Sequence, residues 1–163
     1  MQKYETDALT DRLIDFLERR PKDQPFFAIL SVQPPHDPFM APPEYMSHFD
    51  PNAVILRPNV PMNEEACKKY RRDLAGYYAQ IENLDFNVGR VMNALKSMNL
   101  LDSTNLAFFS DHGIVMAHMG MSEKVVHGKK PFVSRASFVQ QGEKAKSVFL
   151  MPPLIMLILL LLR

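Results

Sequence analysis

The sequence predicts an α/β fold in which a mostly parallel sheet is flanked by helices. Two short, continuous apolar runs, FFAIL at residues 26–30 and LAFF at residues 106–109, have the length and composition of strands buried on both faces. Amphipathic patterns precede the first run and separate it from the second. This alternation of helix, strand and loop is typical of a layered sheet, and 163 residues are enough for one domain.

Two helices are predicted from the spacing of apolar residues. The first begins at Thr6 or Asp7, which can cap a helix, and ends before Pro21. The second is long and is expected to end near Asn99. Its apolar stripe consists of Leu74, Tyr78, Ile81, Leu84, Val88, Val91 and Leu95.

The C-terminal run at residues 154–162 is intensely apolar, yet it has roughly half of the ~20 residues that a membrane-spanning helix needs. Pro152 and Pro153 would break a longer helix, so we expect a buried strand or helix and no membrane span. The formal net charge of +1 lacks the strong positive charge expected of a nucleic-acid-binding protein, so no nucleic-acid partner is expected. The opening residues MQKYE lack the apolar segment of a secretory signal, which a fragment would have lost in any case.

Polar residues follow both predicted strands, where ligands bind in open α/β sheets. Asp111 and His112 come directly after the second strand, and Gly113 permits the sharp turn that would let both side chains reach one metal ion. A turn carboxylate beside an ordinary histidine is the alternative, and the spacing alone leaves both open. His36 follows the first strand inside Pro34-Pro35-His36-Asp37-Pro38, where a stiff loop could hold it as a donor to an anion or simply leave it on the surface.

Two other residues carry candidate chemistry. Lys124 is a point charge that suits a sulfate or phosphate oxygen, although a solvated lysine is the commoner case. Cys67 is the only cysteine, which excludes an internal disulfide and a cysteine-based metal cluster. With Arg71 it forms Cys-x-x-x-Arg, but a structural cysteine at the start of the long helix is the preferred interpretation.

Taken together, several segments of residues 4–124 resemble the sulfatase family of the alkaline-phosphatase-like superfamily. The order and spacing of these segments make the resemblance specific. The matching segments are Tyr4 to Phe16, Pro25-Phe26-Phe27 with Pro35-His36-Asp37-Pro38, Tyr77-Tyr78 to Leu95, and Phe109-Ser110-Asp111-His112-Gly113.

The resemblance implies a fold, a chemistry and residue roles. The fold would be a partial alkaline-phosphatase-like sandwich that is incomplete at its N-terminal side. His36 and Lys124 would contact the sulfate group of a sulfate-ester substrate, and both would be catalytic. Asp111 and His112 would bind a divalent cation, most often calcium, with manganese or magnesium as alternatives. Such enzymes hydrolyse sulfate esters with a formylglycine made from Cys or Ser in a Cys/Ser-x-Pro/Ala-x-Arg motif.

The chain also departs from the family pattern. The nucleophile motif lies upstream in the family, and Cys67 does not supply it because Lys69 occupies the Pro/Ala position. Met119 stands where the family often has histidine. The acidic stretch and the arginine that the family has after Lys124 are not recognisable, so residues 1–124 are expected to form the catalytic-domain fragment and residues 125–163 a divergent continuation. We therefore expect a sulfuric ester hydrolase fragment that is inactive alone. A phosphate or phosphonate ester hydrolase of the same superfamily, or a non-catalytic remnant, is the alternative.

Overall fold

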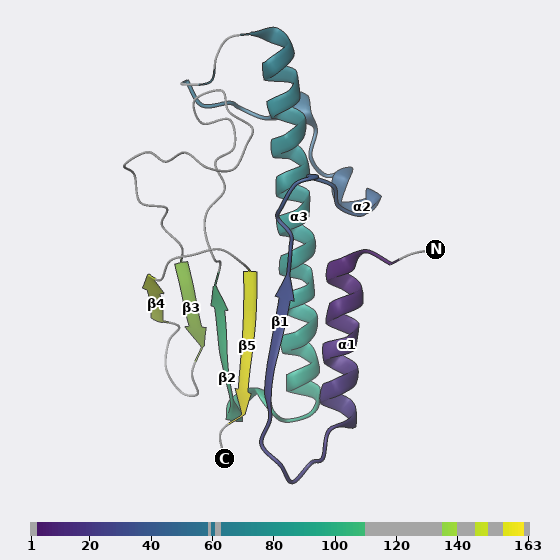
Figure 1. The fold of residues 1–163 in the computed structure, drawn as a ribbon, viewed down its shortest axis with the longest axis vertical. Coiled ribbons are helices and arrows are strands. Elements are labelled where there is room, and N and C mark those ends of the chain that lie inside the picture. Colours follow the sequence, from purple (N-terminus) through teal and green to yellow (C-terminus); the bar gives the residue numbers. More distant parts are fainter. Residues whose placement is uncertain are drawn as a thin grey trace. The chain divides into compact units, whose positions relative to one another are not determined.

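The helices and strands follow the predicted alternation. The computed structural model describes residues 3–58, 60, 63–109, 135–139, 146–149 and 155–161. The helices are α1 (Glu5–Arg19), α2 (Pro43–Met46) and α3 (Glu64–Ser97), with 3-10 turns at Pro51–Ala53 and Leu101–Ser103. The strands are β1 (Phe27–Val32), β2 (Thr104–Phe109), β3 (Arg135–Val139), β4 (Lys146–Phe149) and β5 (Ile155–Leu161) (Figure 1).

The chain divides into two compact units. The first, the sheet unit, comprises Met1–Gln33, Asp85–Gly113 and Pro131–Arg163. The second, the loop unit, comprises Pro34–Leu84 and Ile114–Lys130. The predicted boundary at residue 124 lies outside the described residues and stays a prediction.

The sheet has the strand order β1-β5-β2-β3-β4, and every described pairing in it is antiparallel. The prediction of a mostly parallel sheet is therefore wrong for these strands. The reason is the C-terminal apolar run, which forms β5 and lies between β1 and β2 (Figure 1), where Leu30 pairs with Leu157 and Phe108 pairs with the same residue. Because β1 and β2 are each antiparallel to β5, they run in the same direction without being neighbours.

Within the apolar run at residues 154–162, Ile155–Leu161 thus form a strand, one of the two structures predicted for the run. No described helix has both the length and the apolar character needed to cross a membrane. In β1 the burial alternates: Leu30 and Val32 are buried, whereas Phe27 and Ile29 are 57% and 47% exposed. The prediction that this strand is buried on both faces is wrong, and its periodicity is that of a strand with one covered face.

The N-cap of helix α1 lies two to three residues earlier than predicted. Tyr4 is its N-cap residue and makes no side-chain cap, while Thr6 is fully buried inside the helix. Leu13 and Leu17 are buried on the same face, as the apolar spacing predicts, and the helix ends at Arg19 before Pro21.

Helix α3 has well-defined ends. At its start the side chain of Asn63 accepts a hydrogen bond from the backbone N–H of Ala66 at 3.0 Å, which satisfies one of the unpaired N–H groups of the first turn. At its end Asn99 adopts φ 55°, and the N–H of Leu100 bonds back to the carbonyl of Leu95 at 2.8 Å. This is a Schellman ending, and it confirms the predicted end near Asn99.

The buried face of α3 differs from the predicted apolar stripe. Leu84, Val91 and Leu95 are buried as predicted, but Tyr78 and Ile81 are 42% and 39% exposed. Small and amide side chains take their place on the buried face. These are Ala75, Ala79, Gln80, Asn83 and Asn87.

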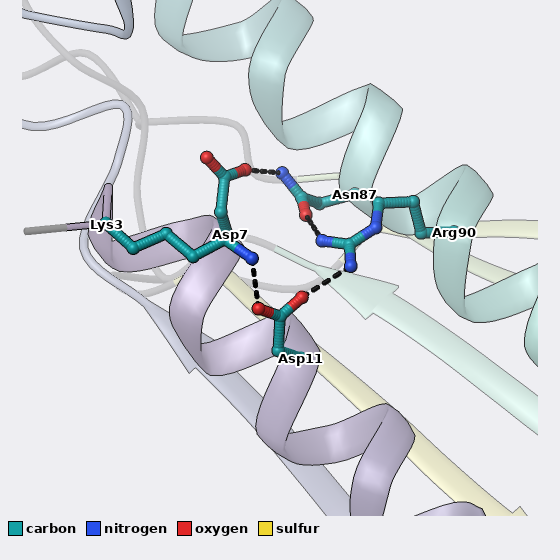
Figure 2. A network of polar contacts seen from close by, with 5 residues as sticks. All are labelled: Lys3, Asp7, Asp11, Asn87 and Arg90. Atoms are coloured by element: carbon teal, nitrogen blue, oxygen red, sulfur yellow. Dashed lines mark hydrogen bonds and ion pairs between the residues drawn. The ribbon is translucent and has the colours of Figure 1, made fainter. Parts of the chain in front are cut away.

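A polar network in the sheet unit joins α1 to the C-terminal part of α3 (Figure 2). Arg90 donates to Asp11 at 2.5 Å and to Asn87 at 2.9 Å, and Asn87 donates to Asp7 at 2.7 Å. Lys3 also pairs with Asp11. Its hydrogen bond lowers the pKa of Asp11 below the ordinary value of 3.8, and Arg90 acts in the same direction.

Candidate functional site

The candidate histidine lies in a loop that follows β1 directly in the sequence. Residues 34–40, called here the His36 loop, form neither helix nor strand, and the peptide bonds Pro34-Pro35 and Asp37-Pro38 are cis. The predicted Pro-rich loop is thus confirmed. A backbone that has no secondary-structure ladder must find its hydrogen bonds elsewhere, so the groups that contact this loop decide where His36 lies.

The ring of His36 is held through one of its two nitrogens. Nδ1 lies 2.6 Å from the carbonyl oxygen of Asp37 and 2.9 Å from its carboxylate Oδ1. Both partners are acceptors, so Nδ1 carries the hydrogen and donates it. Nε2 is therefore the acceptor nitrogen in the neutral ring and a second donor in the imidazolium. With 37% of its side chain exposed, His36 remains accessible to a ligand.

The side-chain amide of Gln80 ties the His36 loop to α3. Its Nε2 donates to the carbonyl oxygens of His36, Pro38 and Met40 at 3.0, 3.1 and 3.3 Å. The carbonyl of Pro38 also accepts the N–H of Met40 at 2.7 Å, which closes a three-residue turn. Three backbone carbonyls thus converge on one buried nitrogen.

The loop backbone also packs directly on α3 at Gly76. A Cβ at this position would collide with the carbonyl oxygen of Phe39 and lie 2.9 Å from its carbonyl carbon. Beside this contact the ring of Phe39 meets Tyr77 edge to face, with centroids 6.2 Å apart. Burial raises the pKa of Tyr77 above its ordinary 10.0, and the neighbouring Tyr78 adds to that effect, so Tyr77 is a neutral phenol at pH 7.

The other predicted site residues lie outside the described residues. Asp111, His112 and Lys124 fall in residues 110–134, and the metal and sulfate roles predicted for them stay predictions. In the part of the chain that the structure describes, no group of three or more His, Cys, Asp or Glu side chains could hold a metal ion.

Two other residues with reactive side chains, His48 and Cys67, lie within the described part of the chain. His48, which lacks supporting context in the sequence, forms an exposed pair with Glu82 at 3.0 Å. Cys67 is half-buried in the first turn of α3 and packs against a small cluster formed by Val60 and Tyr70. This position agrees with the structural role predicted for Cys67.

Gln80 and Gly76 are the contacts that sequence reasoning missed. The predicted apolar stripe places Tyr78 and Ile81, which flank Gln80, on the buried face of α3. A glutamine between them is therefore expected to be exposed. The sequence offers one indication of this contact: Gly76 lies inside a predicted helix, and a glycine in a helix often marks a place where another backbone comes close.

Comparison with known proteins agrees with the resemblance. The sulfatase family model matches residues 2–146. The ulvan-active sulfatase of Formosa agariphila is 35% identical over 116 residues, which are 70% of this chain and 22% of that protein. An arylsulfatase of Clostridium perfringens is 30% identical over 133 residues, covering 69% of this chain and 27% of that protein.

The fold agrees as well. A solved structure from Bacteroides fragilis, the yidJ protein assigned as a sulfatase, superimposes with a TM-score of 0.64 and 32% sequence identity over 73% of this chain. The match covers 27% of that structure, so the chain spans about a quarter of the length of the proteins it resembles.

Proposed function

Because the chain belongs to the sulfatase family, we propose that it carries part of the metal- and sulfate-binding site of a sulfuric ester hydrolase. In this proposal His36 and Lys124 bind the sulfate group of the substrate, and both are catalytic. Asp111 and His112 bind a divalent cation, calcium in the first place. The family match over residues 2–146 supports the reaction class, and the alkaline-phosphatase-like superfamily is consistent with it.

The observation that carries the sulfate role is the way His36 is held. Asp37 occupies Nδ1, so an imidazolium would offer the N–H at Nε2 to a sulfate oxygen. The fixed loop would keep this donor in place without reorganisation, which is what stabilisation of developing negative charge requires. Lys124 would add a point charge to the same anion.

The metal role is supported by the chemistry of the donors. One carboxylate and one imidazole suit a divalent cation but supply few of the about six to eight oxygens that calcium takes. Further ligands would come from segments that lie upstream in the family. A bound cation would polarise the sulfate ester and make the sulfur more open to attack.

The nucleophile is the other part that these residues do not supply. No Cys/Ser-x-Pro/Ala-x-Arg motif occurs in the 163 residues, so we propose that this polypeptide alone does not hydrolyse sulfate esters. The purified polypeptide should show no turnover of an aryl sulfate. Turnover that Asp111→Ala abolishes would contradict the proposal.

The coding sequence upstream of Met1 tests the reaction class separately. An in-frame formylglycine motif there would establish sulfuric ester hydrolysis by the longer protein. A threonine or serine nucleophile outside such a motif would contradict it and favour a phosphate or phosphonate ester hydrolase.

A further inference from the structure

Gln80 is a buried residue whose amide orientation is dictated by its surroundings. Only 2% of its surface is exposed, and three carbonyl oxygens face its side-chain nitrogen. Since carbonyls only accept hydrogen bonds, the NH₂ group must point at the His36 loop and Oε1 away from it. The two hydrogens of Nε2 are shared among the three acceptors.

We propose that Gln80 is the positioning residue of His36. It bonds to the carbonyl of His36 itself and to the carbonyls two and four residues later, so it fixes both the place and the rotation of the short backbone segment that carries the imidazole. This inference rests on the proposed function, in which His36 binds the sulfate group. Gln80 acts only through the loop and touches neither ligand nor substrate in this account.

The neighbouring contacts show why the helix needs this residue at this position. Gly76, one turn earlier on α3, lets the loop backbone come so close that no side chain fits between them. That approach brings the carbonyls of residues 36–40 against the helix and away from water, where unpaired carbonyls would be costly. Gln80 satisfies them with a side chain long enough to reach all three.

Two substitutions separate the donor function of Gln80 from its volume. Gln80→Met keeps a similar length and apolar packing but removes both hydrogens. Gln80→Glu keeps the shape and turns the donor into a carboxylate that faces three carbonyl oxygens. Asn87→Ala is the matched control, because it removes another buried amide of α3 whose partners are Asp7 and Arg90.

The readout is the imidazole of His36, observed by ¹⁵N NMR in the full 163-residue chain with and without sodium sulfate. The unsubstituted protein should carry a hydrogen on Nδ1 and show a saturable shift of its Nε2 signal on addition of sulfate. Both Gln80 variants should lose the Nδ1–H preference, and their sulfate binding should weaken about tenfold, the loss expected for one buried hydrogen bond. Asn87→Ala should leave both signals unchanged even if it lowers the stability.

The pH dependence of Gln80→Glu gives a second test. Protonation of the carboxyl restores one O–H donor, so on lowering the pH sulfate binding by Gln80→Glu should recover relative to sulfate binding by Gln80→Met at the same pH, because any protonation of His36 itself is common to both variants. Intact His36 signals in both variants would overturn the inference. A lost Nδ1–H signal in a chain that never responds to sulfate would uphold the positioning role and overturn the proposed function, so the two failures are distinguishable.

Discussion

Gly76 of α3 lies against the backbone carbonyl of Phe39, with no room for a side chain between helix and loop. This contact brings the loop that carries His36 within reach of Gln80. A second glycine of the same helix, Gly89, has no atom within 4 Å of the position that a Cβ would take. The two glycines therefore form a natural pair for comparison.

Gly76→Ala should destabilise the protein, whereas Gly89→Ala should stabilise it. Alanine is intrinsically better than glycine in a helix by roughly 1 kcal/mol, and Gly89→Ala should gain about that amount in denaturant unfolding. At Gly76 the new Cβ must displace backbone, so the free energy of unfolding should fall by about 1–3 kcal/mol in spite of the better propensity. Equal effects at the two positions would show that the loop does not pack on α3 as described.

The Asp11 carboxylate should make the stability depend on pH in a defined direction. Lys3 and then Arg90 lower its pKa in the folded protein, so its contribution is fully present above the unfolded pKa of about 4 and is lost as the pH falls through the folded value. Since 38% of the Asp11 side chain is exposed, solvent screening limits the effect of Asp11→Asn at pH 7 to about 0.5–1 kcal/mol.

The measurement is denaturant unfolding of the protein and of Asp11→Asn at pH 7 and pH 3, where the difference between them should shrink. Asp15→Asn is the control, because Asp15 pairs with Arg19 of the same helix and is 50% exposed. A difference for Asp11→Asn that grows as the pH falls would contradict the assignment.

Asn99 should tolerate glycine and reject a β-branched residue. Its φ of 55° lies in the left-handed region, which costs about 1–2 kcal/mol for residues other than glycine, asparagine and aspartate. Asn99→Gly should be neutral or slightly stabilising, and Asn99→Val should lower the midpoint of thermal unfolding. A Val variant as stable as the Gly variant would mean that α3 ends differently.

Helices α1 and α3 and strands β1 and β2 were predictable from apolar composition and spacing, because a buried face recurs at a regular interval in the sequence. The burial of Leu84, Val91 and Leu95 and the ending at Asn99 follow from that spacing. The direction of strands does not, because β5 pairs with β1 and β2 through backbone groups that every residue carries. Periodicity therefore predicts a strand but not its orientation.

The loop position of His36 was predictable from the sequence, whereas the contacts that hold the loop were not. His36 stands out by its place after a strand in a proline-rich loop, whereas Gln80 bonds to backbone carbonyls 40 to 44 residues away in the sequence. Such long-range bonds between a side chain and the backbone leave no periodic pattern. Tyr78 and Ile81 are exposed because amide and small side chains occupy the buried face of α3, where the apolar pattern had placed the two larger residues.

The proposed metal role of Asp111 and His112 is the central proposal. It is tested most directly by adding manganese to the ¹⁵N-labelled chain in millimolar sulfate, because a bound paramagnetic ion broadens nearby NMR signals even at low occupancy. The signals of Asp111 and His112 should broaden first, and Asp111→Ala should remove this effect. Broadening that centres on His48 and Glu82, or that persists in Asp111→Ala, would contradict the account.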